Sequence, residues 1–205
     1  MTRIGSACFF LFVLPFSAQA AITTSVSKSP TVGIPGFVTD TITASVIPGE
    51  KIIGFDFVSV SSGYGFFGQM SQVNPLGQPT VFADLNSFYP FAGADPSQDS
   101  QFKVEAIKGL VVQPSEGQNF LKAAFNYNNQ YVASEASNSW SFVQIAHSAE
   151  VNYRGTLTVK NVLGVNRLEL IVGVLPAVPE PSSLALLGLA TIATASLSRL
   201  RRSIR

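Results

Sequence analysis

The carboxylate side chains of one central stretch are the groups whose types and spacing fit chemistry best. Asp84, Asp95, Asp99 and Glu105 lie in a segment rich in Gly, Pro and Asn. Two carboxylates at a suitable separation can hydrolyse a glycosidic bond. Oxygen-rich loops also bind calcium, so Asp84, Asp95 and Asp99 are candidate calcium ligands. A third interpretation is that they are solvated loop residues, because the run from Asp95 to Asp99 lacks the Gly and terminal Glu of an EF-hand loop.

This chain contains few residues that could serve in nucleophilic catalysis. His147 is the only histidine, so any Ser-His-Asp triad would have to use it as the general base. No Gly-x-Ser-x-Gly motif accompanies it, and a histidine at the end of an apolar strand is more typically held by hydrogen bonds. Cys8 is the only cysteine, so the chain beyond this position has no thiol for catalysis, disulfides or metal binding. We therefore expect no enzyme activity, no catalytic residue and no cofactor.

Aromatic side chains offer a possible binding surface. Tyr64, Phe66 and Phe67 alternate with glycines, and Phe88 to Phe91 form a second cluster. Exposed rings can stack on sugars, but the chain has 16 Phe against 5 Tyr and 1 Trp. Because Phe lacks the polar edge that Tyr and Trp present to water, core packing is the competing interpretation.

The segments that would position these side chains have the alternating pattern of β-strands. Val38, Ile42 and Ala44 share one parity with Val46, while Thr and Ser take the other. Pro48-Gly49 then predicts a turn before the next strand. The predicted strands are Val38–Val46, Lys51–Val60, Thr80–Leu85, Gln101–Gln113, Asn119–Phe125, Ser139–His147, Glu150–Val159 and Arg167–Leu175.

These strands predict an all-β fold for residues 21–177, an antiparallel β-sandwich or a jelly-roll-like domain. Both parities of Ser139–His147 are apolar, which predicts a strand covered on both faces. Residues 119–129 could equally form a short helix. Residues 22–177 carry eight basic and eleven acidic side chains, a net charge of −3, so we expect no nucleic-acid partner.

The N-terminus has the three parts of a secretory signal peptide, residues 1–20. Arg3 supplies the positive charge, and an uncharged apolar run follows it. Ala18 and Ala20 provide the small side chains that signal peptidase accepts. The mature chain is therefore predicted to begin at Ala21.

The C-terminal residues 178–205 also divide into three parts. Residues 178–183 hold Val178, Pro179, Glu180 and Pro181, and the two prolines favour an extended backbone. Residues 182–198 carry no charge and are about long enough for a transmembrane helix. The tail at 199–205 contains Arg199, Arg201, Arg202 and Arg205, which should stay in the cytoplasm.

These three parts, in this order, resemble the PEP-CTERM sorting signal of Gram-negative-type bacteria. The resemblance covers residues 178–205 only, and an ordinary single-pass anchor is the alternative. It implies recognition by an exosortase, cleavage near the motif, and transfer to the cell surface or release. It also implies association with exopolysaccharide and biofilm.

We therefore expect an exported surface or extracellular-matrix protein that the C-terminal helix anchors transiently in the inner membrane. Signal peptidase and exosortase are its expected partners, with extracellular polysaccharide as a further one. Two alternatives for the middle domain stay open, a secreted hydrolase acting on polysaccharide and a calcium- or carbohydrate-binding adhesion module.

Overall fold

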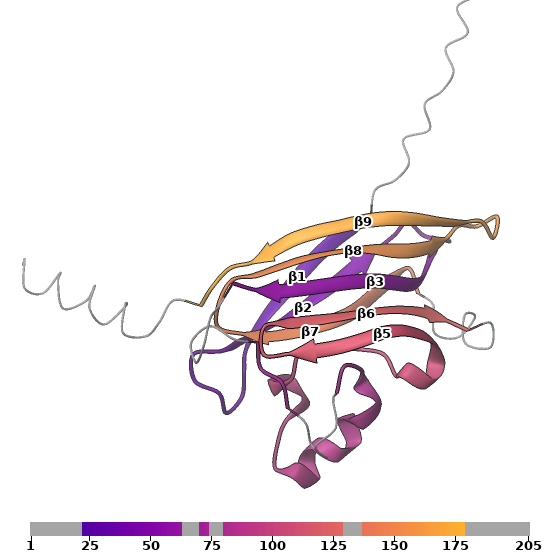
Figure 1. Cartoon of the computed structure of the whole chain (residues 1–205). Helices are drawn as coiled ribbons and strands as arrows, with labels where there is room; N and C mark the ends of the chain where they lie inside the picture. Colours follow the sequence, from indigo (N-terminus) through magenta and orange to yellow (C-terminus); the bar gives the residue numbers. More distant parts are fainter. Residues whose placement is uncertain (1–21, 63–69, 74–79, 129–136, 179–205) are drawn as a thin grey trace, which may run out of the picture.

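The chain forms two antiparallel sheets that face each other (Figure 1). The computed structural model describes residues 22–62, 70–73, 80–128 and 137–178. Sheet A has the order β1 (Thr23–Pro30), β2 (Val38–Ser45), β7 (Ser139–His147) and β4 (Gln101–Phe102). Sheet B has the order β5 (Gly109–Gly117), β6 (Phe120–Tyr127), β3 (Lys51–Ser61), β8 (Val151–Lys160) and β9 (Asn166–Leu175). The all-β prediction is confirmed.

Aromatic rings fill the space between the sheets. On β3, Phe55 and Phe57 are buried while Asp56 between them is exposed, as the alternation of a strand requires. Phe142 of β7 reaches across from sheet A, with its ring centroid 5.7 Å from that of Phe55 and 5.5 Å from that of Phe57. Phe102 of β4 stacks on Phe55 at 4.6 Å. Much of the phenylalanine in this chain is therefore core.

Five predicted strands agree with the structure to within one residue at each end: β2, β3, β7, β8 and β9. Residues 120–127 form β6, so the strand interpretation of this segment is right and the helix alternative is wrong. Residues 142–147 of β7 are all buried, as the apolar character of both parities predicts. On one side of this strand, Gln144 donates to the carbonyls of Pro96 and Asp99 in a covering loop.

The predicted strand Thr80–Leu85 is wrong, because a 3-10 helix, η1, spans Ala83–Ala92. Phe82 alone makes a bridge, to Phe102. The residues that follow Leu85 do not favour a strand, since Asn86 and Pro90 within η1 are poor strand residues. Asp84 accepts a hydrogen bond from the backbone N–H of Ala106 at 2.8 Å, which ties the helix to the next corner.

The predicted strand Gln101–Gln113 is also wrong as a single strand. Only Gln101–Phe102 pairs with β7, in sheet A. The chain then turns through η3 (Ala106–Lys108) and enters sheet B as β5. A short 3-10 helix, η2 (Pro96–Gln98), precedes this crossing.

The structure adds one strand that the sequence pattern does not reveal. β1 pairs with β2 over its whole length, yet its Ser- and Thr-rich sequence shows no apolar alternation. Within the described ranges, no helix is long and apolar enough to span a membrane. The predicted signal peptide at 1–20 and the predicted membrane helix at 182–198 lie outside those ranges.

Candidate functional site

A cluster of buried polar groups lies at the base of η1. Asp99 is fully buried, and its Oδ1 accepts a hydrogen bond from the N–H of Val73 at 3.0 Å. Its Oδ2 accepts from the hydroxyl of Thr80 at 2.6 Å and from the hydroxyl of Tyr89. Tyr89 is itself fully buried. The cluster therefore holds η1 against the sandwich through a carboxylate whose oxygens are both engaged by protein donors.

Glu116 of β5 connects this cluster to an open cavity. Its Oε1 accepts a hydrogen bond from the N–H of Thr80 at 2.9 Å. The cavity has a volume of about 470 Å³, within the size range of small-ligand sites. Apolar side chains form most of its wall, and two carboxylates, Glu116 and Asp84, line it. The lining residues are Val81, Phe82, Asp84, Leu85, Ala106, Pro114, Ser115 and Glu116.

The surroundings of the two acids shift their protonation. Burial raises the pKa of Asp99 to about 6, against the opposing effect of its hydrogen bonds from Thr80 and Tyr89. Burial raises the pKa of Glu116 to about 7, and the charge of Asp99 adds to this shift. Near neutral pH Glu116 can therefore exchange a proton at the cavity wall. Asp99 is enclosed, so its role is to hold the fold.

The structure does not gather the three candidate calcium ligands. Asp84 lines the cavity, and Asp99 is buried under Tyr89. Asp95 caps η2, where its Oδ1 accepts from the N–H of Ser97 at 2.7 Å. Glu105 is exposed at the start of η3. In the described part of the chain no three His, Cys, Asp or Glu side chains are close enough to hold a metal ion, so the calcium hypothesis gains no support there.

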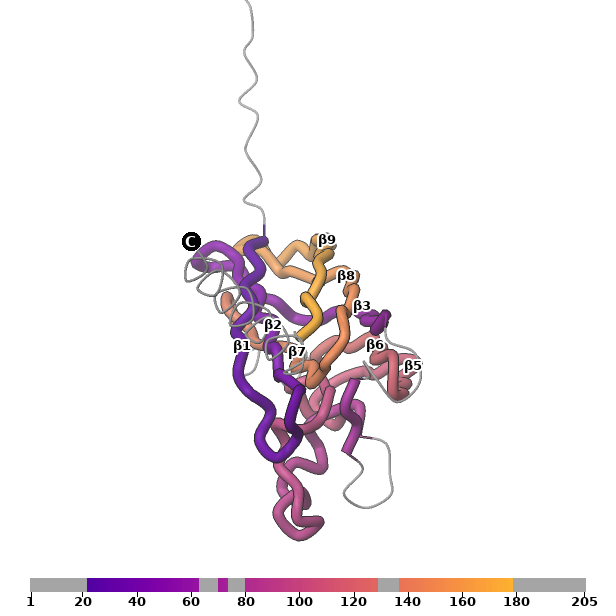
Figure 2. Tube along the Cα trace, turned by 90° about the vertical axis from the view of Figure 1, so that its left-hand side faces the viewer, coloured from indigo at the N-terminus to yellow at the C-terminus, as the bar shows by residue number. Residues whose placement is uncertain are grey.

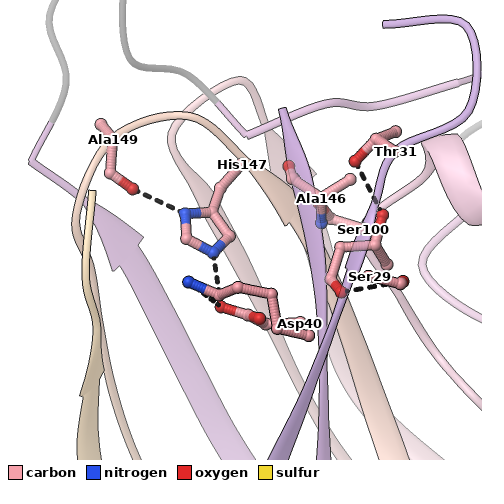
Figure 3. A network of polar contacts seen from close by, with 9 residues as sticks. Ser29, Thr31, Asp40, Ser100, Ala146, His147 and Ala149 are labelled. Carbon is pink, nitrogen blue, oxygen red and sulfur yellow. Dashed lines mark hydrogen bonds and ion pairs between the residues drawn. The ribbon is translucent and has the colours of Figure 1, made fainter. Parts of the chain in front are cut away.

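His147 is held by hydrogen bonds, as its strand-end position predicts (Figure 3). Its ring is fully buried. Nδ1 lies 2.7 Å from the carbonyl oxygen of Ala149, and Nε2 lies 3.0 Å from Oδ2 of Asp40. Asp40 is also fully buried, and Lys28 Nζ lies 3.8 Å from the same Oδ2. With both ring nitrogens engaged inside the protein, this histidine does not face solvent.

The side chains of the second aromatic cluster, residues 88–91, differ in their exposure to solvent. Tyr89 is buried in the Asp99 cluster, whereas Phe91 is 86 % exposed and Phe88 41 % exposed. The two exposed rings keep the sugar-stacking hypothesis open on η1. The first cluster, Tyr64, Phe66 and Phe67, lies outside the described residues.

The described chain ends at the first residue of the predicted sorting motif. After β9 the backbone N–H of Val178 donates to the carbonyl of Ser148 at 2.8 Å. Ser148 is in the turn that follows His147. The remaining residues of the motif, the arginine tail and the predicted cleavage site at Ala18, Ala20 and Ala21 lie outside the described residues.

Sequence reasoning missed two groups that shape these sites, Glu116 and Asp40. Glu116 is 36 residues from Thr80, and Asp40 is 107 residues from His147. The one signal for Asp40 is its parity, because it shares the apolar face of Val38, Ile42 and Ala44. A charged residue at a core-facing position of a strand needs a hydrogen-bond or ion-pair partner. The position of Asp40 therefore predicts that it has such a partner.

Comparison with protein-family models matches residues 177–202 to the PEP-CTERM protein-sorting motif. No curated protein gives a significant match to the chain. The family match starts one residue before the N-terminal end of the predicted motif. It leaves residues 22–176, which include both sheets, unassigned.

Proposed function

Because residues 177–202 form a PEP-CTERM sorting motif, which indicates exosortase-dependent sorting of an exported protein, we propose a surface or matrix role for this chain. In this proposal, residues 182–198 anchor the exported domain in the inner membrane. An exosortase then cleaves near Val178–Pro181. The β-sandwich is displayed at the cell surface or in the exopolysaccharide matrix, where it acts without catalysis.

The observation that carries the proposal is the position of the motif against the folded domain. β9 ends at Leu175, and Val178 is bonded to Ser148. Only Pro176 and Ala177 separate the last strand from that bonded residue. The sorting motif thus begins at the surface of the sandwich, so processing near it would deliver an intact folded domain.

The burial of His147 supports a role without catalysis. The only imidazole of the chain is enclosed, with a carbonyl and a carboxylate on its two nitrogens. A serine nucleophile would need this base within reach of its substrate. A structural or adhesive role needs only a stable domain and a signal that sorts it to the right location.

Substitutions in the motif test the sorting step in the native host. Pro179→Ala with Pro181→Ala removes a helix penalty of about 3 kcal/mol per proline, which lets helix extend through the motif. Glu180→Gln keeps the shape and removes the charge. We expect both variants to accumulate as uncut or mislocalised precursor, detected by gel mobility and cell fractionation.

Deletion of residues 199–205 is the matched comparison, because it leaves the motif intact and changes orientation and retention instead. If the proline and glutamine variants reach the surface with wild-type size and yield, the motif does not direct sorting.

The cavity beside Glu116 favours a second candidate function, hydrolysis of a polysaccharide. Glu116 could donate a proton near neutral pH, and Asp84 is the second carboxylate of the same cavity. The test is turnover of a polysaccharide panel by the full chain and by Glu116→Gln. Turnover that the substitution abolishes would replace the non-catalytic proposal, and we expect no turnover from either protein.

A further inference from the structure

The four edge strands of the two sheets differ in how they are protected. A bare edge presents unpaired N–H and C=O groups, and proteins usually blunt it with charge, proline, a bulge or short length. β4 has only two residues. β1 carries Lys28 and ends at Pro30, and most of its other side chains are Ser or Thr. β5 contains Pro114, a residue with positive φ (Gln113, 48°) and a register shift against β6.

β9 has none of these devices except two charges, Arg167 and Glu169, which lie on the partly buried face of the strand. It pairs with β8 without a register shift over all ten of its residues, and it contains no proline. No described residue pairs with its outer edge. Figure 1 shows β9 along one rim of sheet B, with β5 along the other rim.

One face of β9 is an exposed apolar row. This row, the β9 row, consists of the four side chains that point away from the sandwich core. Their exposed fractions are 71 % for Leu168, 73 % for Leu170, 71 % for Val172 and 53 % for Val174. Four exposed large aliphatic side chains at alternating positions of one edge strand are unusual for a monomer.

The charges of β9 lie on its other face and are already paired. Arg167 donates to Glu50 through Nη2 at 2.7 Å and to Glu169 through Nε at 2.6 Å. The β9 row itself carries no charge. Bringing two such rows together therefore opposes no like charges.

We propose that β9 is a self-association edge, where a second copy of this chain adds its own β9 in antiparallel orientation. A two-fold axis at Ile171 would place Leu168 opposite Val174 of the second copy and Leu170 opposite Val172. Every outward side chain of the row then meets an aliphatic partner, and the two B sheets become continuous. Among the described edge strands, β9 is the one that offers this aliphatic complement.

After β9 ends, the described chain does not fold back over the unpaired outer edge of this strand. After Leu175 it reaches Val178, which is bonded to Ser148 beside the start of β8. Figure 2, viewed along the sandwich, shows β9 and β5 at separate margins of the molecule. The β9 edge is thus open in the described part of the chain and has room for a strand.

Cysteine cross-linking tests the contact in the full chain, expressed in its host. Leu170→Cys places a thiol on the β9 row, and Leu110→Cys is the matched control. Leu110 is 68 % exposed and lies on the outer face of the same sheet, at the β5 edge. Both variants carry Cys8→Ser, which leaves one thiol. In the proposed register the two introduced thiols at position 170 lie diagonal to each other, roughly 7–8 Å apart and too far for a disulfide, so a short bismaleimide is used to join them. With this reagent we expect Leu170→Cys to form a covalent dimer of about twice the monomer mass, and Leu110→Cys to remain a monomer.

A charge substitution gives an independent readout. Leu170→Lys puts like charges near the two-fold axis, so the purified full chain should sediment at about half the wild-type mass, while Leu110→Lys should sediment as the wild type does. Circular dichroism checks that each variant is folded. The proposal is overturned if the wild type is a monomer, if Leu170→Cys links to a different protein or does not link, or if both cysteines link equally.

Discussion

The proton on His147 follows from the two atoms that its ring faces. The carbonyl oxygen of Ala149 can only accept, so Nδ1 carries a hydrogen and donates it. A neutral ring would then present the lone pair of Nε2 to the carboxylate of Asp40. The contact is favourable only if the pair holds one proton more than a neutral imidazole and an ionised carboxylate do together. The pair is then either imidazolium with carboxylate or imidazole with carboxylic acid. The other carboxylate oxygen, Oδ1, has no hydrogen-bond partner among the described residues.

Two substitutions at Asp40 separate this protonated pair from simple packing. Asp40→Ala leaves the buried imidazole unpaired at Nε2, and removing one partner of a buried pair costs about 3–5 kcal/mol. Asp40→Asn supplies an amide N–H that donates to Nε2 of a neutral ring, so its cost should be about 1 kcal/mol. For a domain of this size, the alanine variant should melt on the order of 10 °C lower.

Urea unfolding of residues 21–178, followed by circular dichroism, measures both costs. Asp56→Ala is the control, since Asp56 is an exposed aspartate on a strand and its loss should change the free energy of unfolding by about 0.5 kcal/mol or less. Equal costs for Asp40→Asn and Asp40→Ala would refute the proton assignment. No cost for the alanine variant would show that the pair does not contribute to stability.

Other expectations concern pH, packing and export. Because the raised pKa of Glu116, about 7, makes the folded state bind more protons than the unfolded state, the free energy of unfolding should fall as the pH rises from about 4.5 to 7. Glu116→Gln should reduce that fall by about 1 kcal/mol, discounted for partial exposure, in urea titrations at both ends of the window. Gly173→Ala should destabilise the domain by about 1–3 kcal/mol, because a Cβ there would lie 2.2 Å from the hydroxyl of Tyr153; an unchanged melting temperature would contradict this packing. The secreted protein should begin at Ala21 and, lacking Cys8, should melt at the same temperature with and without reductant; N-terminal sequencing and calorimetry check both points.

Strands with clear parity could be predicted from the sequence, and strands without it could not. β2 and β7 alternate or are apolar throughout, so local pattern is enough for them. β1 has no such pattern, and it forms because the edge of β2 offers it eight partners in register. Thr80–Leu85 looks like a strand, but the buried hydroxyl of Tyr89 on Asp99 and the proline at 90 draw the segment into a 3-10 helix.

The candidate sites depend on contacts that are distant in sequence. The candidate carboxylates of the 84–105 stretch are close in sequence, yet the fold separates them, and Glu116 of β5 lines the same cavity as Asp84 of η1. The pairing of Asp40 with His147 depends on the register of β2 against β7, which no local pattern specifies. The sorting motif is the opposite case, because its composition and order alone identify it.

The strand order also determines how this domain would carry tension. β1 starts opposite Ser45, at the end of the sandwich away from Val38, and β9 ends opposite Val151, beside His147. The first strand therefore begins and the last strand stops at opposite ends of the molecule (Figure 1). A pull between these two ends would run along the strands and load the ten pairs of β8 and β9 together in shear, instead of peeling them one at a time. A domain tethered by its C-terminus in moving water would then resist extension through its whole last hairpin.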